Sequence, residues 1–438
     1  MRHRVAVVGA GPAGLMAAET IATKDDQADV TIYEQMPRPA RKFLLAGRGG
    51  LNLSNAAAPG AFFAAFRDGS SVEPGPPATL NRALQMFDRT ALEAWCKSLA
   101  IETFVGSSGR VFPIAMKASP LLRAWLRRLD EHGVKLRTRH KFIGIERDGA
   151  LAFQTPDGLT HVAATAAVFA TGGASWPRLG SDGDWRTVFA EHGVKTRPFQ
   201  PSNVGVMVRW SDHLRATTAG QPLKRVAVTV GGKTSRGELI ITEFGLEGGP
   251  IYALSPELRQ LLDGRPRTAV DGSDRRDMQP TLSLDLRPDL SAHEVARRLR
   301  KAKSAKSLST NLKSAAGLSA AAARLLREPS SGVRPTTPEG WADRIKQFEL
   351  NIDGFAGLDR AISTVGGLAM DAIDESCRLR PTSSDDAVHG SNVNYYAAGE
   401  MLDWDAPTGG YLLHASMALG QLAGATVVAD LAAAEKPQ

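Results

Sequence analysis

The sequence of 438 residues contains only two cysteines, Cys96 and Cys377, which lie far apart. It has no CxxC motif, so a dithiol redox centre and a thiolate zinc site are both disfavoured, and we expect no metal site. A disulfide framework is excluded, and the cysteine content favours a reducing compartment. No uninterrupted apolar stretch approaches the ~18 residues of a membrane span. We therefore expect a cytoplasmic protein without a membrane span.

Aromatic side chains are absent from the stretch where positive charge gathers. The net charge is +7, and much of the excess lies between Arg297 and Arg327, a stretch without acidic residues. Its other basic residues are Arg298, Arg300, Lys301, Lys303, Lys306, Lys313 and Arg324. A basic patch can bind nucleic acid or an anionic membrane. Because no aromatic residue is available to stack on bases, we favour a solvated helical surface.

The length exceeds one compact core, so we expect several domains. Strand and helix patterns alternate at both ends of the chain, which indicates an α/β domain that is interrupted by an insert. Short strands between glycines and prolines dominate 197–288, and an Ala-, Leu- and Lys/Arg-rich helical region follows over 289–345. We therefore predict a nucleotide-binding domain from 1–196 and 346–438, with the last part beginning on a return strand.

The first glycine cluster lies between a predicted strand and a predicted helix. Val5 to Val8 is a short apolar run, and Gly9-x-Gly11-x-x-Gly14 follows it directly. Pro12 falls in the first helical turn, where its missing N–H costs nothing. An acidic residue, Glu34, stands twenty residues beyond Gly14 at the end of the next predicted strand. In this context the motif is a strong dinucleotide-binding fingerprint.

Each part of this fingerprint has a physical role. Gly9 permits the tight turn, Gly11 lets a pyrophosphate approach the backbone, and Gly14 lets the helix pack closely on the strand. The helix N-terminus offers unpaired N–H groups and a positive dipole end to phosphates. Glu34 can accept hydrogen bonds from ribose hydroxyls, and its charge disfavours a 2′-phosphate and therefore NADP.

Two further glycine turns favour FAD over NAD. The apolar strand Val162 to Ala170 ends at Thr171-Gly172-Gly173. Near the C-terminus, Tyr395 to Glu400 and Thr408 to Tyr411 precede a long helix whose N-terminus could stabilise a reduced flavin. Three separated turns that converge on one ligand indicate a long cofactor such as FAD.

With these motifs the chain resembles the YhiN/BaiN-like flavoproteins, also described as aminoacetone-oxidase-like FAD-binding enzymes. The matching stretches include VAVVGAGPAGLMAA, RKFLLAGRGGLNLSN, VFATGGASWPRLGSDGD and NYYAAGEMLDWDAPTGGYLLHASMALGQLAG. The resemblance implies an α/β fold: a Rossmann-like FAD-binding domain of the two-dinucleotide-binding-domain flavoprotein type, with an inserted β-barrel and a helical subdomain. Proposed activities in the family include reduction of enone-type steroids and oxidation of amines.

One motif departs from the family pattern. The family commonly carries Gly-Arg-Cys-Asn where this chain has Gly49-Gly50-Leu51-Asn52. Leu51 replaces the cysteine, so a role that requires this thiol is absent. The chain therefore resembles a divergent subgroup, and the resemblance alone does not identify its substrate.

These patterns predict a set of cofactor-binding residues. They are Gly9, Gly11, Pro12, Ala13, Gly14, Glu34, Gln35, Arg41, Lys42, Gly47, Asn52, Thr171, Gly172, Gly173, Gly399, Glu400, Gly409, Gly410, Tyr411 and Leu412. Arg41 to Asn55 forms a basic, amide-bearing loop after the second strand, where such folds bind ligands. The alternative interpretation of this segment is an ordinary exposed loop without a ligand.

Acid–base candidates lie near the start of the last helix. We predict His414 and Tyr411 as catalytic residues, with Asp403 and Asp405 as further candidates. A lone histidine on an Ala- and Leu-rich helix is more often packed than catalytic, and this alternative stays open. Trp404 would stack near the flavin or fill a turn. Asp182 and Asp184 are more typical of turns.

The sequence has no second dinucleotide fingerprint between Leu151 and Arg360. A separate NAD(P)H domain is therefore disfavoured, and electrons would come from transiently docked NAD(P)H or from the substrate. We predict an FAD-dependent oxidoreductase that transfers a hydride between flavin and a small organic substrate. An amine oxidase that uses O₂ and an FAD-containing RNA-binding or RNA-modifying protein are the alternatives. The oligomeric state is not predicted.

Overall fold

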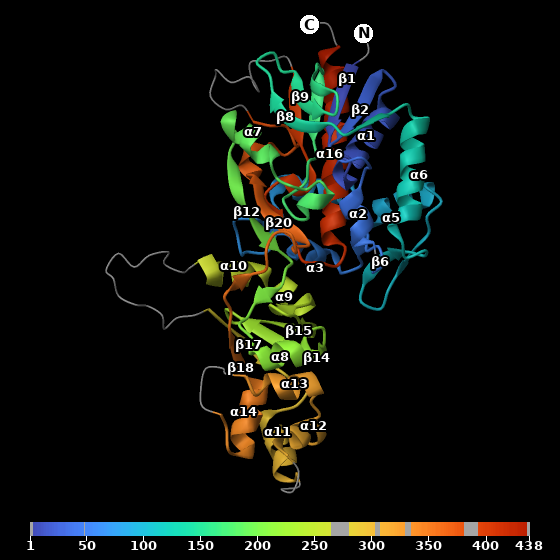
Figure 1. The fold of residues 1–438 in the computed structure, drawn as a ribbon. Helices are drawn as coiled ribbons and strands as arrows, with labels where there is room; N and C mark the ends of the chain where they lie inside the picture. Colours follow the sequence, from blue (N-terminus) through green and yellow to red (C-terminus); the bar gives the residue numbers. More distant parts are fainter. Residues whose placement is uncertain are drawn as a thin grey trace, which may run out of the picture. The chain divides into compact units, whose positions relative to one another are not determined.

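A computed structural model of the chain describes residues 3–47, 49–263, 280–302, 307–328, 334–380 and 393–435. Residue contacts divide the chain into two compact units (Figure 1). The first unit is Met1–Gln200 with Ser363–Gln438, and the second is Pro201–Ile362. The boundaries predicted from the sequence fall at 196/197 and 345/346. The first unit is thus built from two segments that are distant in the sequence.

A five-stranded parallel sheet forms the centre of the first unit (Figure 1). Its strands, in spatial order, are β21 (Asn394–Ala397), β11 (Ala166–Phe169), β1 (His3–Val8), β2 (Ala28–Glu34) and β7 (Lys135–Thr138). All four neighbouring pairs are parallel. The strands β1 and β11 are largely buried runs of small and branched apolar residues, as expected for a parallel sheet. The predicted α/β, Rossmann-like fold is confirmed.

Helices α1 (Pro12–Lys24) and α16 (Tyr411–Ala434) pack against each other in this unit (Figure 1). Glycines allow their close approach. A Cβ atom at Gly420 would lie 2.2 Å from the carbonyl oxygen of Ala13, and one at Gly424 would lie 2.7 Å from that of Ala17. The C-terminal helix therefore supports the start of α1, where the predicted phosphate site lies.

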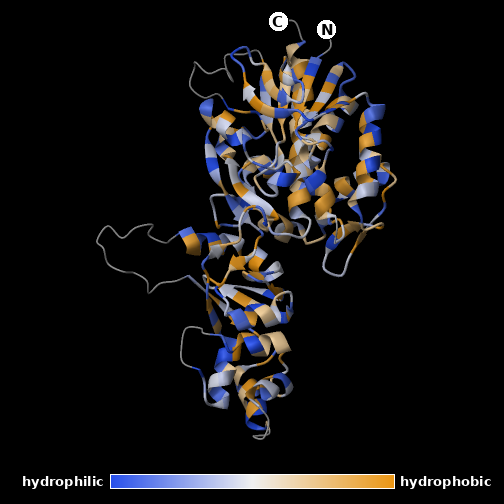
Figure 2. Ribbon diagram, viewed as in Figure 1, coloured by the Kyte–Doolittle hydropathy of each residue, from blue (hydrophilic) through white to orange (hydrophobic). Residues whose placement is uncertain are grey.

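The helix α16 is the long C-terminal helix expected from the sequence, and it bears on the expectation of no membrane span. Within the described residues, α16 is one helix that is both long enough and apolar enough to cross a membrane, judged by length and composition alone. A test for uninterrupted apolar runs misses it because single polar residues, such as His414 and Gln421, break the run. In the most apolar 18-residue stretch of this helix, 56% is buried within the fold, which is typical of a core helix. Figure 2 shows its position among the apolar elements of the first unit.

The first unit contains further elements, of which β12 continues past its boundary at Gln200. They are α2 (Arg41–Ala46), β3 (Ser54–Asn55), α3 (Pro59–Ala64), β4 (Arg67–Asp68), α4 (Ala78–Met86), α5 (Arg89–Ser98), β5 (Thr103–Val105), β6 (Arg110–Pro113), α6 (Ala118–Glu131), β8 (Lys141–Ile145), β9 (Leu151–Thr155), β10 (Gly158–Val162), η1 (Pro177–Leu179), α7 (Trp185–Glu191), β12 (Thr196–Ser202), β20 (Ser363–Leu368), η2 (Met370–Ala372), η3 (Gly399–Met401) and β22 (Trp404–Asp405). They form small sheets in the orders β10-β9-β8 and β3-β6-β5, with the pairs β12-β20 and β22-β4.

The second unit has its own sheet and its own apolar core. Its antiparallel strands, in spatial order, are β18 (Phe348–Asn351), β17 (Thr281–Asp285), β14 (Pro222–Val230), β15 (Lys233–Ile241), β16 (Gly245–Glu247), β13 (Val206–Met207) and β19 (Gly354–Phe355). A β-barrel is predicted here from the sequence, and the pairing found among the described residues runs from β18 at one edge to β19 at the other.

Helices complete the second unit. They are α8 (Asp212–Thr218), α9 (Gly249–Ala253), α10 (Ser255–Asp263), α11 (Ala292–Arg300), α12 (Leu308–Ser314), α13 (Ala320–Leu325) and α14 (Pro338–Lys346). Serine or threonine side chains cap α8 and α11 to α14 by accepting a backbone N–H of the first turn.

Acidic partners neutralise part of the basic stretch in the second unit. Arg297 and Arg298 both donate to Glu294. Arg300 lies 2.8 Å from a carboxylate oxygen of Glu339. Lys303 and Lys306 of this stretch lie outside the described residues. The pairing favours the solvated helical surface over a nucleic-acid patch.

Candidate functional site

The first glycine turn of the predicted fingerprint joins β1 to α1, and its geometry explains each glycine. Gly9 has φ +104°, and a Cβ there would lie 2.4 Å from the carbonyl oxygen of Ala170. A Cβ at Gly14 would lie 1.9 Å from the carbonyl oxygen of Gly9. By contrast, a Cβ at Gly11 would meet no protein atom within 4 Å. Gly9 and Gly14 are therefore required by packing, whereas Gly11 keeps a space open.

The carboxylate of Glu34 is fixed beside this turn. The backbone N–H of Ala10 donates to one of its oxygens at 2.9 Å, and that of Met36 donates to the other at 2.8 Å. Burial raises the pKa of Glu34, and these two hydrogen bonds oppose the rise. Each oxygen has a second lone pair, so the oriented carboxylate can also accept hydrogen bonds from a sugar diol.

The second glycine turn, at the end of β11, is held by side chains from the segment that follows it. The Trp185 indole N–H donates to the carbonyl oxygen of Gly172 at 2.9 Å. The Ser181 hydroxyl donates to that of Gly173, also at 2.9 Å. Gln35, the residue after Glu34, donates to the carbonyl oxygen of Gly180 at 2.8 Å. Side-chain bonds thus connect this turn to the end of β2.

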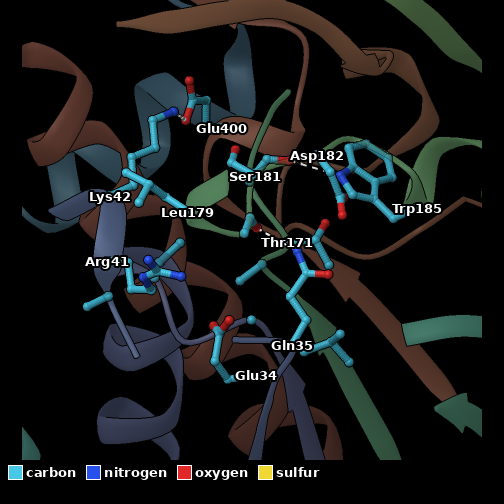
Figure 3. A pocket seen from close by; sticks show the side chains of 18 of the residues that line it. Glu34, Gln35, Arg41, Lys42, Thr171, Leu179, Ser181, Asp182, Trp185 and Glu400 are labelled. Atoms are coloured by element: carbon cyan, nitrogen blue, oxygen red, sulfur yellow. Dashed lines mark hydrogen bonds and ion pairs between the residues drawn. The ribbon is translucent and has the colours of Figure 1, made fainter. Parts of the chain in front are cut away.

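An ion pair joins distant segments at one end of the cleft (Figure 3). The Lys42 ammonium lies 2.6 Å from a carboxylate oxygen of Glu400 and donates to the Ser175 hydroxyl at 2.6 Å. The other oxygen of Glu400 accepts the backbone N–H of Thr364 at 3.1 Å. Both charged side chains are only partly exposed, 26% for Lys42 and 18% for Glu400.

One cavity collects many of the predicted cofactor residues (Figure 3). Those that line it are Gly9, Gly11, Pro12, Ala13, Glu34, Gln35, Arg41, Lys42, Thr171, Gly172 and Glu400. The lining does not include Gly14, Gly47, Asn52, Gly173, Gly399, Gly409, Gly410, Tyr411 or Leu412. Gly47 packs instead against Ala118 at the start of α6. The individual cofactor contacts therefore stay predictions.

The cavity also contains residues that the sequence patterns did not predict for it. His140, Leu179, Ser181, Asp182 and Trp185 are among its lining residues. Asp182 belongs to a GSDGD stretch that is typical of a turn, and its side chain nevertheless faces the cavity. Position soon after the second glycine turn is the signal that could have identified Leu179, Ser181, Asp182 and Trp185, whereas His140 follows the end of β7.

The two predicted catalytic residues lie in different environments. His414 is fully buried, and its ring nitrogens contact the Ser54 hydroxyl at 2.8 Å and the carbonyl oxygen of Phe87 at 2.7 Å. Tyr411 is half-buried and packs against the rings of Phe62 and Phe66. The geometry of His414 favours the packed alternative, and the catalytic role of both residues stays a prediction.

Acidification is expected to destabilise the protein through His414. Burial lowers its pKa from 6.5 to about 4. Between these values the unfolded chain binds a proton that the native state excludes, so the free energy of unfolding falls as the pH decreases. The loss is complete below the native pKa and amounts to roughly 3 kcal/mol. Urea unfolding at pH 7 and at about pH 4.5 should show a smaller loss in His414→Gln than in the wild type.

The cleft fits FAD on its own geometry. Among the described residues no side chain caps the N-terminus of α1, so its first N–H groups can bind phosphate oxygens. The open space beside Gly11 admits the pyrophosphate, and Glu34 is oriented for the ribose. No group of three or more potential metal ligands occurs within the described ranges. Fold and cleft together define a Rossmann-type dinucleotide site that fits FAD, and with the comparisons described next they make the chain an FAD-dependent oxidoreductase.

Comparison with family models gives the family. Residues 3–426 match the model described as HI0933-like protein Rossmann domain, so the chain belongs to the HI0933-like family. This confirms the resemblance stated from the sequence motifs.

Known proteins resemble the chain over nearly its whole length. It is 25% identical to the 3-dehydro-bile acid delta(4,6)-reductase of Clostridium scindens, over 99% of this chain and 100% of the relative. A solved structure of 3-ketosteroid-delta4-(5alpha)-dehydrogenase from Rhodococcus jostii RHA1 has TM-score 0.45 and 15% identity, covering 99% and 97% of the two chains. A flavocytochrome c3 fumarate reductase has TM-score 0.45 and 15% identity, covering 98% and 78%.

Proposed function

We propose that the protein is a flavin-dependent reductase of a small, largely apolar organic substrate with a conjugated carbonyl. The observation that carries this proposal is the full-length similarity to a curated bile-acid reductase. The cleft supports it, because Glu34 and the turn at Gly11 are arranged for a dinucleotide cofactor. FAD, when bound, would supply the hydride chemistry.

The protein side chains would bind the cofactor and donate a proton to the substrate. Lys42 places a positive charge at one end of the cleft, where it can offset the charge of phosphates or of a reduced flavin. Burial raises the pKa of Tyr411, so its phenol stays protonated at neutral pH. We propose Tyr411 as the proton donor to the substrate; it does not line the cavity itself, and the proposal depends on the predicted contact of the adjacent Gly409-Gly410 turn with the flavin end.

NAD(P)H is the proposed electron donor, docking transiently. The sequence contains one dinucleotide fingerprint, and in this proposal FAD occupies it. A cytoplasmic location is retained as a proposal, since both cysteines are free and buried, as is usual in a reducing compartment.

Anaerobic stopped-flow spectroscopy tests the function. NADH or NADPH should bleach the flavin absorbance, and a conjugated enone should restore it. Tyr411→Phe should slow the restoration by about 10²-fold, because the proton donor is lost, and should leave the bleaching rate unchanged.

The alternative outcome is also specific. Bleaching by amines but not by pyridine nucleotides, followed by peroxide formation with O₂, would identify an amine oxidase. If neither donor bleaches the flavin, the reductase and the oxidase are both wrong.

A further inference from the structure

A buried histidine connects three separate elements near the Gly409-Gly410 turn. His414 lies in the first turns of α16, Ser54 lies on β3, and Phe87 follows the end of α4. The ring of His414 contacts the Ser54 hydroxyl at 2.8 Å and the Phe87 carbonyl oxygen at 2.7 Å. Both Ser54 and His414 are fully buried.

The hydrogen-bond partners determine the tautomer. The Phe87 carbonyl oxygen can only accept, so His414 Nε2 carries the proton. The Nδ1 atom is then an acceptor, and the Ser54 hydroxyl donates to it. Burial lowers the pKa of His414, and the backbone bond to Phe87 and the charge of Asp88 oppose this only in part. The ring therefore stays neutral with both nitrogens engaged by the protein.

Through Ser54 the histidine acts on the turn that precedes its own helix. A Cβ at Gly410 would lie 2.3 Å from the Ser54 carbonyl oxygen, so the two backbones touch. With its amide assigned from the hydrogen-bond network, Asn52 donates to that oxygen at 3.0 Å and accepts from Gly410 N–H at 3.2 Å. Asn55 donates to the Gly409 carbonyl oxygen at 3.2 Å. The strand β3 and the turn thus form one hydrogen-bonded unit.

We propose that Ser54 and His414 form a positioning pair, which holds β3 against the Gly409-Gly410 turn and thereby sets how tightly this turn binds the flavin. The proposal rests on the proposed function, in which FAD occupies the cleft, and on the prediction from the sequence that the turn, which does not line the cavity itself, contacts the flavin end. His414 acts on the cofactor through Ser54. It does not exchange protons with the substrate, since neither ring nitrogen is available.

Variants can separate the two hydrogen bonds of the ring. In His414→Asn the amide oxygen replaces Nδ1 as acceptor for Ser54, whereas in His414→Gln the amide nitrogen can replace Nε2 as donor to Phe87. We expect the dissociation constant for FAD to rise about tenfold in Ser54→Ala and in His414→Gln, and much less in His414→Asn. Adding His414→Gln to Ser54→Ala should cause little further change, because both remove the same link.

The measurements are anaerobic isothermal titration with oxidised and with dithionite-reduced FAD, and urea unfolding of each apoprotein. Because the turn is expected to act on the flavin end, the two redox forms should be weakened unequally, by a factor of about three or more. Thr426→Ala is the matched control: its buried hydroxyl donates to Leu422 within the same helix, far along α16 from the turn. It should change stability but not FAD affinity.

The outcomes are distinct. If the wild type binds no FAD, this proposal and the proposed function are both wrong. If the wild type binds FAD and the Ser54 and His414 variants lose only stability, with unchanged affinities for both redox forms, the pair has a purely structural role and the positioning proposal alone is overturned. Ser54→Ala removes a single oxygen atom, so this variant is expected to fold. It therefore still tests the proposal if His414→Gln fails to fold.

Discussion

Replacing Gly11 with valine is expected to abolish FAD retention while the protein stays folded. Gly11 has φ −82°, which any residue can adopt, and an added Cβ meets no protein atom within 4 Å. The branched side chain would therefore fill the space beside the first N–H groups of α1, where the pyrophosphate is expected. The purified variant should show no flavin absorbance after incubation with FAD and removal of the excess.

Two other glycines provide the controls for this experiment. Gly60 is exposed on α3, and a Cβ added there would meet no protein atom within 4 Å, so Gly60→Val should retain FAD fully. Gly14→Ala should instead destabilise the fold itself, because its Cβ would lie 1.9 Å from a backbone oxygen. Normal flavin content in a folded Gly11→Val protein would show that the cofactor binds elsewhere.

Removal of the Lys42 charge is expected to weaken FAD binding by about a hundredfold. Lys42→Met deletes a cation from the cleft and leaves the partly buried Glu400 carboxylate without its ion partner, close to the expected phosphates. Glu400→Gln should cost less, since a glutamine can still accept the backbone N–H of Thr364. The double variant should lose less FAD-binding free energy than the two single variants lose together, because it leaves no unpaired charge.

Isothermal titration of each apoprotein with FAD measures these effects. The control is Lys135→Met, which removes an exposed lysine paired with Asp29 on the neighbouring strand. Exposed pairs contribute little, so this variant should bind FAD as the wild type does. Equal FAD affinity in Lys42→Met and Lys135→Met would mean that Lys42 has no role in the cofactor site.

The glycine turns and Glu34 were predictable from the sequence because the structure needs them locally. A strand, a tight turn and a helix start follow one another along the chain, and each step has its own residue preference. The Lys42 and Glu400 positions were also identified, from loops that leave strands of the predicted sheet. Their mutual contact was not predictable, because 358 residues separate them.

Long-range partners account for what sequence reasoning missed. Ser175 and Thr364 complete the environment of Lys42 and Glu400; Ser175 closely follows the second glycine turn but was not singled out, and Thr364 has no neighbouring motif. The environment of His414 depends on Phe87, whose relevant atom is a backbone oxygen that any residue would supply. The long helix α16, by contrast, was expected from the sequence at nearly its observed position.

The division of the first unit into two sequence segments has a consequence for biosynthesis. The strand β21 and the helix α16 are translated after the whole second unit, yet β21 pairs with β11 and α16 packs on α1. A chain still emerging from the ribosome therefore exposes one side of β11 and of α1 until its final segment is released. We therefore expect FAD to bind stably only after translation is complete, and a prematurely terminated chain to be a substrate for chaperones and proteases rather than a cofactor-binding fragment.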